Sequence, residues 1–135
     1  AFKNLVWNLI EVRNMKLKNN ISIDTLLKEY EDKDVFNDAQ LCNIKLGLIM
    51  GDEVSIYAKP EFNYKQMDAI ASGMIHNIDV TKYADYRYSY LQMLAIRDAL
   101  IEGIDVTPYI TFDTAPMTIR LLTKSLRLEK NNRKD

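Results

Sequence analysis

The side chains best suited to chemistry in this chain are one histidine, one cysteine and a recurring set of acids. His76 is the only histidine and Cys42 is the only cysteine. A catalytic base needs a second group to orient it, and a zinc site needs several sulfur, nitrogen or carboxylate ligands at short spacings. The sequence places no such group beside either residue. We therefore expect no catalytic centre, no metal and no cofactor, with His76 exposed or capping a helix C-terminus.

Three acids recur at matching places along the chain, namely Glu53, Asp79 and Asp105. A row of carboxylates could bind a metal ion or supply acid and base groups. Each also follows directly on a predicted helix stop, where an acidic side chain can accept a hydrogen bond from the backbone of the next turn. The recurrence favours capping, because structural roles recur in every copy of a repeat whereas catalytic roles usually do not.

A tyrosine-rich stretch at residues 83–90, with the sequence YADYRYSY, is the most unusual local feature. Tyr86, Arg87 and Tyr90 fall outside the apolar positions described below, and Tyr64 occupies the repeat place of Tyr90. Exposed tyrosine and arginine are enriched at protein interfaces, where a few such residues carry most of the binding energy. They can also stack on unpaired bases, or pack between neighbouring repeats. We predict that these four residues contact a protein partner.

Charge is distributed unevenly, although the net charge is only −1. Residues 24–113 hold eight Lys and Arg against sixteen acids, whereas residues 114–135 hold six against two. Arg120, Lys124 and Arg127 follow one another at helical spacing. Such a basic face could contact phosphates, and it would equally complement the helix dipole and give the last repeat a polar end. These three residues are the candidate nucleic-acid contact.

A repeated pattern sets the architecture that carries these residues. Residues 36–113 contain one 26-residue unit three times, as FNDAQLCNIKLGLIMGDEVSIYAKPE, FNYKQMDAIASGMIHNIDVTKYADYR and YSYLQMLAIRDALIEGIDVTPYITFD. The second and third copies are identical at 11 of 26 aligned positions. A unit this short cannot bury its own apolar stripe, but stacked copies can, which is the principle of solenoid proteins.

Each copy begins with a strong helix-start signal. A short polar residue is followed three positions later by glutamine, the pattern of a capping box in which the two residues satisfy each other's backbone N–H groups. An aromatic residue before the cap and an apolar residue five positions after that aromatic form a hydrophobic staple. The boxes are Asn37–Gln40, Asn63–Gln66 and Ser89–Gln92, and the staples are Phe36–Leu41, Phe62–Met67 and Tyr88–Met93.

An apolar stripe and a stop signal complete each predicted helix. The stripe includes Ile44, Ile70 and Ile96, and small residues beside it would let another backbone come close. Gly or Asn then ends the helix in the left-handed conformation. In the connector we expect a buried valine and a buried tyrosine, with Ser or Thr beginning a turn or short helix. The small residues are Gly47, Gly73 and Ala99, the stops are Gly51, Asn77 and Gly103, and the buried pairs are Val54 and Tyr57, Val80 and Tyr83, and Val106 and Tyr109.

The pattern Q-M-x-x-I-R-x-x-L-x-x-G-I-D-V-x-x-Y, found from Gln92 to Tyr109, resembles a short repeat of uncharacterised proteins from Gram-positive bacteria, their phages and conjugative elements. The resemblance covers residues 36–113. Copies in that family often end in Y-A-x-P-x-F, which Tyr57–Phe62 keeps, whereas the second copy lacks the proline and the third lacks the alanine. The resemblance implies a helical array of mobile-element origin, and it carries over no catalytic residue.

The predicted fold is an all-α helical repeat array in a single domain. Pro116 suits the first turn of the last helix, and Asp113 or Thr114 is the expected cap. Helices are expected over residues 2–19, 24–31, 38–50, 64–76, 90–102 and 115–129. The three parts of the chain are an N-terminal cap or degenerate repeat at 1–35, three repeats at 36–113, and a capping helix with a basic tail at 114–135.

Composition excludes several classes of protein. Apolar residues make up 47% and charged residues 27% of the chain, as in ordinary globular proteins, and no apolar run approaches the roughly 18 residues of a membrane helix. One cysteine excludes an internal disulfide, and we expect a cytoplasmic location. We predict a non-enzymatic protein-interaction module that acts as an inhibitor or adaptor of a host protein. A nucleic-acid-binding accessory domain is the alternative and an enzyme is the third class, while unpaired end repeats would allow a homodimer.

Overall fold

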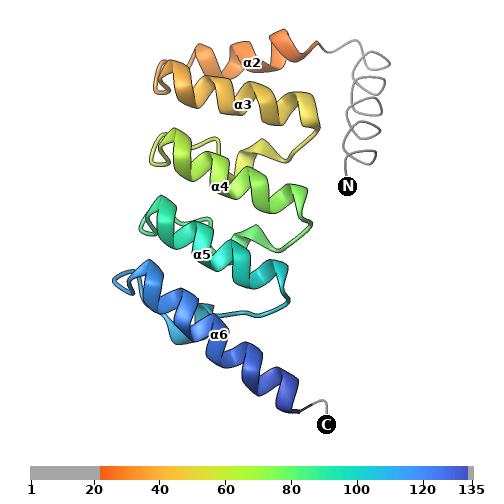
Figure 1. Ribbon diagram of the computed structural model, residues 1–135. Coiled ribbons are helices and arrows are strands. Elements are labelled where there is room, and N and C mark those ends of the chain that lie inside the picture. Colours follow the sequence, from red (N-terminus) through yellow and green to blue (C-terminus); the bar gives the residue numbers. More distant parts are fainter. Residues whose placement is uncertain (1–21, 134–135) are drawn as a thin grey trace. The chain divides into compact units, whose positions relative to one another are not determined.

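The computed structural model describes residues 22–133, and this part of the chain contains helices and no β-strand (Figure 1). The prediction of an all-α fold is confirmed, whereas the helix expected over residues 2–19 lies outside the described residues. The α-helices are α2 (Ile23–Glu31), α3 (Asp38–Met50), α4 (Tyr64–Ile75), α5 (Tyr90–Ile101) and α6 (Pro116–Asn132). Short 3₁₀-helices follow three of them, namely η1 (Val54–Ile56), η2 (Val80–Lys82) and η3 (Thr107–Tyr109).

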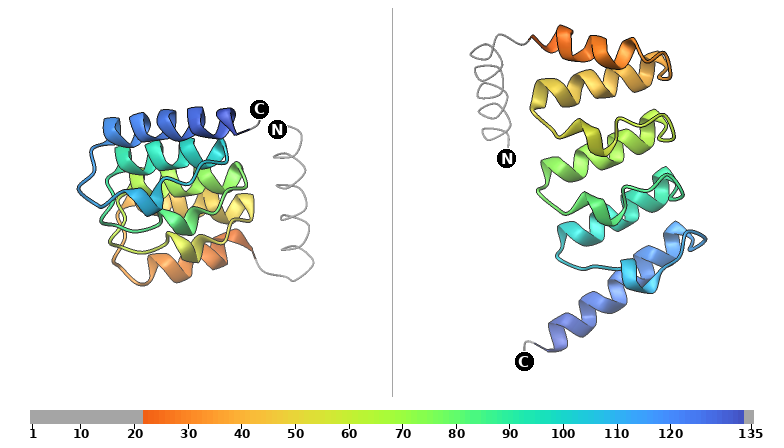
Figure 2. Two further views of the ribbon diagram at one scale, coloured as in Figure 1. Left: turned by 90° about the horizontal axis from the view of Figure 1, so that it is seen from below. Right: turned by 180° about the vertical axis from the view of Figure 1, so that it is seen from behind.

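The chain, which its length led us to expect as a single domain, divides into two compact units. They comprise residues 1–71 and 72–135, so the boundary falls inside α4. In the first unit α2 lies against α3, and in the second unit α5 lies against α6, as both views of Figure 2 show. The stacking of the copies along the whole chain stays a prediction.

All three capping boxes form as predicted. Asn37 Oδ1 accepts from the N–H of Gln40 at 2.8 Å, while Gln40 Oε1 accepts from the N–H of Asn37 at 2.8 Å. Each box satisfies two of the backbone donors that a helix N-terminus leaves unpaired. This explains why α3, α4 and α5 begin at the residues expected from the sequence. The same reciprocal bonds, 2.8–3.2 Å long, form in the pairs Asn63–Gln66 and Ser89–Gln92.

The glutamine of the box makes a second connection that the sequence pattern does not reveal. Gln92 is 6% exposed, and its Nε2 donates to the carbonyl oxygens of Phe112 at 2.7 Å and Thr114 at 2.8 Å. One buried side chain therefore caps its own helix and also holds the segment that leads into the next helix. Gln40 does the same in the first unit, with the carbonyl oxygens of Pro60 at 3.4 Å and Phe62 at 2.6 Å as acceptors.

Left-handed residues end the three repeat helices, as predicted. Their φ angles are 77° at Gly51, 58° at Asn77 and 79° at Gly103. Glycine adopts this conformation without a steric cost, and asparagine tolerates it better than most residues. The N–H of the following residue bonds back into the last helical turn at 2.9–3.3 Å in each copy, so the chain turns sharply into its connector.

A tyrosine from the connector fills the space beside the small residue of the stripe, where the sequence led us to expect another backbone. The hydroxyl of Tyr57 lies where a Cβ on Gly47 would be, and Val54 Cγ1 lies 2.7 Å from that position. Tyr57 is 0% exposed, so glycine at residue 47 is required by the ring that packs on it. The second unit repeats this arrangement with Gly73, Tyr83 and Val80, whose Cγ1 lies 2.6 Å from the corresponding position.

Tyr109 is the exception, and the prediction that it is buried is wrong. Its side chain is 65% exposed, whereas Tyr57 and Tyr83 are 0% exposed. The reason lies at residue 99, which is alanine where the other copies have glycine. In those copies a Cβ at this position would overlap the tyrosine hydroxyl, so we infer that the methyl group of Ala99 leaves no room for the ring. The third connector therefore keeps its buried valine, Val106, but turns its tyrosine outward.

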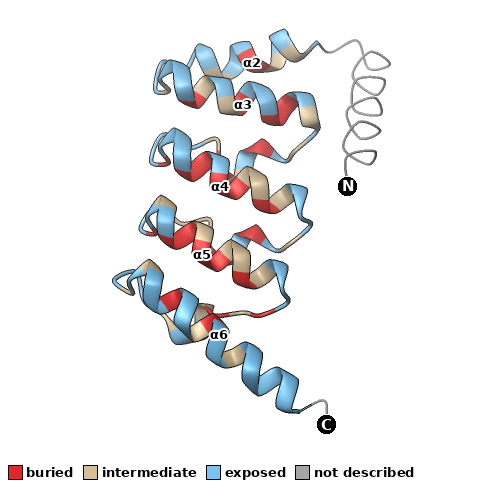
Figure 3. Cartoon of the chain, viewed as in Figure 1, coloured by how far each residue is buried: buried red, intermediate tan, exposed pale blue. Residues whose placement is uncertain are grey.

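The predicted apolar stripe lies in the core. Ile44, Ile70 and Ile96 are each 0% exposed, and Figure 3 shows buried residues on α3, α4 and α5. Helix α6 is mostly exposed, with Ile119 and Thr123 as its buried residues. Leu122 and Leu126 of α6, which occupy the repeat places of Ile96 and Leu100, are half-buried.

Helix α6 has Pro116 in its first turn, as predicted, but it covers Pro116–Asn132 instead of 115–129 and lacks the expected side-chain cap. Its N-cap residue is Ala115, and no side chain there accepts a hydrogen bond from the first turn. Asp113 and Thr114 lie before the cap position, and Thr114 Oγ1 instead accepts from the N–H of Thr111 at 2.9 Å. Gln92 donates to the carbonyl oxygens of Phe112 and Thr114 just before this helix start, as Gln40 does before the capped start of α4.

We expect Gln92→Glu to destabilise the protein even though it keeps the capping box. A carboxylate oxygen still accepts from the N–H of Ser89, but both donors to Phe112 and Thr114 are lost and a negative charge faces two carbonyl oxygens. Leaving buried polar groups unsatisfied in this way costs about 2–4 kcal/mol. Urea denaturation measures the free energy of unfolding. The exposed change Asn131→Asp is the matched control and should alter it by less than about 0.5 kcal/mol, so equal effects would contradict the role of Gln92.

We expect Gly47→Ala to lower the free energy of unfolding by about 1–3 kcal/mol, because the new methyl group overlaps the Tyr57 hydroxyl. Tyr57→Phe removes that hydroxyl and should recover part of the loss in the double variant. Ala39→Gly, at an exposed position of α3, is the control and should cost only the usual helix-propensity difference of up to about 1 kcal/mol. Stabilisation by Gly47→Ala, as at an ordinary helical glycine, would rule out the packing of Tyr57 on this residue.

Candidate protein-interaction surface

Arg87 is fixed by a salt bridge within the turn between η2 and α5. Its Nε and Nη2 donate to the two carboxylate oxygens of Asp85 at 3.0 and 2.8 Å, and its backbone N–H donates to Asp85 Oδ1 at 2.9 Å. The turn itself closes through the N–H of Tyr88, which donates to the carbonyl oxygen of Asp85 at 3.1 Å. The guanidinium is thus held in one orientation although its side chain is 56% exposed.

Two aromatic rings lie beneath this arginine. The Arg87 guanidinium carbon lies 4.1 Å from the centroid of the Phe112 ring, and that ring lies 4.6 Å from the ring of Tyr88. Tyr88 is buried, whereas Phe112 is 37% exposed. The backbone of Phe112 is in turn held by Gln92, so the capping box of α5 positions the ring on which the arginine stacks.

Electrostatics reinforce this arrangement. The hydrogen bonds from Arg87 lower the pKa of the Asp85 carboxyl below its ordinary value, and they outweigh the opposing effect of its slight burial. The same pairing raises the pKa of Arg87. Both groups are therefore charged at neutral pH, and the exposed face of the guanidinium is available to a partner.

Tyr86, the residue before Arg87, is 59% exposed. We call Asp85, Tyr86, Arg87 and Phe112 the Arg87 cluster.

The other two residues predicted to contact a partner are placed separately. Tyr90 opens α5 and is half-buried, which leaves only part of its ring accessible. Tyr64 opens α4 in the first unit and is 47% exposed, and its carbonyl oxygen accepts from Asn43 Nδ2 at 2.7 Å. Tyr86, Arg87 and Tyr90 thus belong to one unit, whereas Tyr64 belongs to the other.

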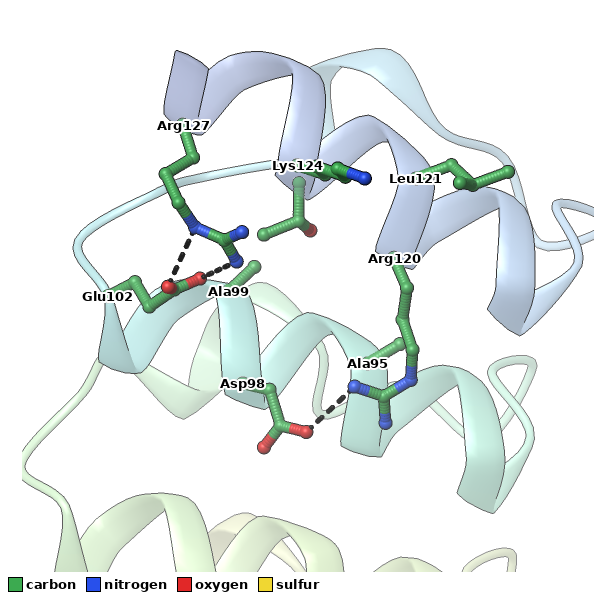
Figure 4. Close-up of a pocket in the computed structure, with 9 residues that line it drawn as sticks. Ala95, Asp98, Ala99, Glu102, Arg120, Leu121, Lys124 and Arg127 are labelled. Atoms are coloured by element: carbon green, nitrogen blue, oxygen red, sulfur yellow. Dashed lines mark hydrogen bonds and ion pairs between the residues drawn. The ribbon is translucent and has the colours of Figure 1, made fainter. Parts of the chain in front are cut away.

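The candidate nucleic-acid contacts lie along a groove of about 360 Å³ between α5 and α6 (Figure 4). Arg127 Nε and Nη2 donate to the two carboxylate oxygens of Glu102 at 2.9 and 2.8 Å. Arg120 Nη1 donates to Asp98 Oδ2 at 2.9 Å. Lys124 lies between these two arginines and is exposed. Of the three residues of the predicted basic face, Arg120 and Arg127 therefore form ion pairs with α5, and Lys124 lies between them.

The acids of this groove are held in their charged form. Burial tends to raise the pKa of Asp98, but hydrogen bonds from Arg97 and Arg120 more than offset it, so the pKa lies below the ordinary value. The hydrogen bonds from Arg127 likewise lower the pKa of Glu102. Arg120 and Arg127 thus already form ion pairs within the protein, so a phosphate would have to compete with two carboxylates for their guanidinium groups.

Of the residues weighed as catalytic or metal-binding, His76, Asp79 and Asp105 have local partners. His76 is exposed at the end of α4, with Nδ1 2.8 Å from the carbonyl oxygen of Ser72, and Cys42 is exposed. Asp79 and Asp105 cap the following turn by accepting from the N–H groups of Thr81 and Thr107, at 3.1 and 3.0 Å. The third acid, Glu53, makes no such bond, which corrects the expectation that all three cap.

Among residues 22–133, no group of three or more His, Cys, Asp or Glu side chains is arranged to hold a metal ion. None of the helices in the same range combines the length and apolar character needed to cross a membrane.

Sequence reasoning missed four residues that define these surfaces. Asp85 is two positions before Arg87, and that short spacing is a signal that could have identified the pair. Phe112 lies 25 residues beyond Arg87, but it occupies the repeat place of Tyr86, which is also aromatic. Asp98 and Glu102 pair with arginines 22 and 25 residues away, and no local pattern marks them.

We expect Arg87→Gln to raise the pKa of Asp85 back toward 3.8, because the charged donors that stabilise the carboxylate are lost. A carboxylate whose folded-state pKa is depressed adds stability above its unfolded-state pKa and loses that stability as the pH falls through the folded value. The difference in stability between wild type and variant should therefore shrink below about pH 4. NMR titration of the carboxyl carbon measures the pKa. Lys82→Gln, which breaks the separate bridge to Asp105, should leave the Asp85 titration unchanged.

Comparisons of the chain with protein-family models, with curated proteins and with solved structures found no significant match. The function has therefore to be inferred from the chemistry of the surfaces described above.

Proposed function

We propose that this chain is a non-enzymatic protein-interaction module that binds its partner through the Arg87 cluster. The observation that carries the proposal is an exposed tyrosine beside an arginine that is already fixed by Asp85 and stacked on Phe112. Tyrosine and arginine are the side chains most often found at interface hot spots. Tyr90 and Tyr64 are proposed as further contacts.

The fixed geometry of Arg87 supports a role in binding. A flexible arginine loses roughly 0.5–1.5 kcal/mol of side-chain entropy when an interface immobilises it, and an arginine ordered beforehand avoids much of this loss. Phe112 also provides an apolar wall beside the charge, and a cation over an aromatic face is favourable by about 0.5–1 kcal/mol at an exposed site. A partner carboxylate or carbonyl group facing the guanidinium is the expected contact.

The nature of the partner follows from the resemblance to repeats of Gram-positive bacteria, phages and conjugative elements. We propose a mobile-element protein that acts in the cytoplasm as an inhibitor or adaptor of a host protein. Self-association into a homodimer is compatible with this role. Tyr64 lies in the first unit and Tyr86 and Arg87 lie in the second, so each unit offers a proposed contact of its own.

We expect the double variant Tyr86→Ala/Arg87→Ala to lose partner capture from a lysate of the native host, by at least about tenfold, because hot-spot truncations cost about 2 kcal/mol each. Quantitative mass spectrometry of the captured proteins measures the loss. Leu46→Ala on α3, where the leucine is 52% exposed, is the matched control and should capture as wild type does. Unchanged capture by the double variant would falsify the assignment of the Arg87 cluster.

A nucleic-acid-binding accessory domain is the alternative. It is favoured by Lys124, which is exposed without an ion-pair partner among the described residues, and by the excess of basic residues on α6. The ion pairs of Arg120 and Arg127 count against it, since a phosphate would have to displace Glu102 and Asp98.

If nucleic acid binds at α6, its affinity should fall steeply with salt, and Lys124→Gln should reduce the slope of log K against log salt by about 0.9 for duplex DNA. Fluorescence anisotropy with labelled duplex DNA and single-stranded RNA measures this slope. Lys65→Gln, on α4 in the first unit, is the control. Absence of binding at low salt would exclude the alternative.

A further inference from the structure

Asp85 uses one edge of the Arg87 guanidinium and leaves another edge for a further acceptor. The bonds of 3.0 and 2.8 Å from Nε and Nη2 to the two carboxylate oxygens occupy the edge that these nitrogens share. A guanidinium is planar and carries N–H donors around its rim, so those of Nη1 point away from Asp85. Within residues 22–133, Nη1 of Arg87 donates no hydrogen bond. A carbonyl or carboxylate of another molecule can therefore bind along this edge.

The two faces of the same guanidinium also differ. Phe112 lies against one face, with its ring centroid 4.1 Å from the guanidinium carbon, and the ring of Tyr88 lies 4.6 Å from that of Phe112. The Arg87 side chain is nevertheless 56% exposed. Because Phe112 covers one face and Asp85 one edge, this exposure lies on the opposite face and along the Nη1 edge. An aromatic ring is attracted to either face of a guanidinium, so a second ring can stack on the exposed one.

Charge decides which acceptor fits the Nη1 edge. The Asp85 carboxylate already neutralises Arg87, so the pair has no net charge to attract an anion. Asp113 follows Phe112 in the chain, and its exposed carboxylate forms no ion pair in the part of the chain that the structure describes. A partner carboxylate would therefore meet a neutral pair with a further negative charge on the neighbouring residue. A main-chain carbonyl makes the same hydrogen bond without this repulsion.

Arg127 provides a comparison within the same protein. Its Nε and Nη2 donate to the two carboxylate oxygens of Glu102 at 2.9 and 2.8 Å, so it uses the same edge as Arg87 (Figure 4). Its side chain is 45% exposed, which is close to the value for Arg87. Among the described residues, no aromatic ring stacks on Arg127, whereas Phe112 stacks on Arg87. The two arginines thus share an ion-pair geometry and differ in the ring.

We propose that the Arg87 cluster binds an aromatic side chain of its partner, whose ring stacks on the exposed face of Arg87 while a main-chain carbonyl beside it accepts from Nη1. This inference rests on the proposed function, because it names what the partner places on the surface identified there. The partner ring continues the column formed by Tyr88, Phe112 and the guanidinium. Asp85 and Phe112 hold the guanidinium in place beforehand, so the ring binds without first ordering a flexible side chain.

The test uses short capped peptides of glycine and serine that carry tryptophan, leucine or glutamate at the central position. NMR titration of the full chain measures each affinity and follows the side-chain Nε–H signal of Arg87. We expect the tryptophan peptide to bind about two- to fivefold more tightly than the leucine peptide. We expect the glutamate peptide to bind no more tightly than the leucine peptide. The tryptophan ring should also shift the Arg87 Nε–H signal upfield and leave that of Arg127 in place.

Three variants separate the contributions. Arg87→Gln should lose the preference for tryptophan, because no cation is left to stack on the ring. Arg127→Gln breaks a bidentate ion pair of the same kind, so it is the matched control and should bind as wild type does. Asp85→Asn removes the charge that neutralises Arg87 and should raise the affinity for the glutamate peptide. The dispersion of the NMR spectrum shows that each variant is folded.

Tighter binding of the glutamate peptide to wild type, lost in Arg87→Gln, would overturn the inference, since the partner group is then a carboxylate. Equal binding of all the peptides, no binding at millimolar concentration, or a tryptophan preference that Arg87→Gln retains would overturn it too. The proposed function is tested separately by capture from the lysate. Capture that requires Tyr86 and Arg87, without a tryptophan preference, refutes this inference alone. A tryptophan preference with capture unchanged in the double variant refutes the proposed function instead.

Discussion

A buried glutamine side chain links consecutive helices, and the rest of the structure depends on it. Gln92 completes the capping box of α5 with its oxygen and holds the carbonyl groups before α6 with its nitrogen. Both ends of the amide are satisfied, so burial costs little, whereas any replacement leaves several polar groups unpaired. The distance between two helix starts is therefore fixed by one side chain. Because Phe112 is one of the residues held in this way, the same bond positions the ring beneath Arg87.

The connectors show how a second constraint acts on side-chain volume. A glycine in the helix and a tyrosine in the connector form one unit of packing in the first two copies, because the ring needs the space that a Cβ would fill. Val54 and Val80 occupy the rest of that space. Packing at this density leaves no freedom to enlarge one member alone. Between α5 and α6 the buried Ile119 lies in the core, and exposed ion pairs from Arg120 and Arg127 to acids of α5 add to the contact at its surface.

Much of the fold could be predicted from local sequence signals, since capping boxes, helix stops and helical periodicity all act within a few residues. The all-α class, the bounds of the helices and the left-handed stops were accessible in this way. The position of Tyr109 was not, because it depends on Ala99 ten residues earlier. The missing cap at Ala115 and the ion pairs of Asp98 and Glu102 were also inaccessible, since they depend on contacts 20 or more residues apart. In the candidate site, composition indicated Tyr86 and Arg87, but only the structure placed Phe112 beneath the guanidinium.

The side chain of one helix residue, glycine or alanine, separates the copies with a buried connector tyrosine from the copy with an exposed one. Where the helix has glycine, at residues 47 and 73, the tyrosine ring is buried in the core. Where it has alanine, at residue 99, the ring is exposed to solvent. In the third copy Val106 stays buried, but the 3₁₀-helix of the connector begins at Thr107, one repeat position later than in the other two copies. A Gly-to-Ala change at this helix position, which a single nucleotide substitution can produce, therefore affects both the tyrosine and the local course of the connector. The phenol of Tyr109 is therefore an exposed group that the third copy offers for binding and the other two copies do not.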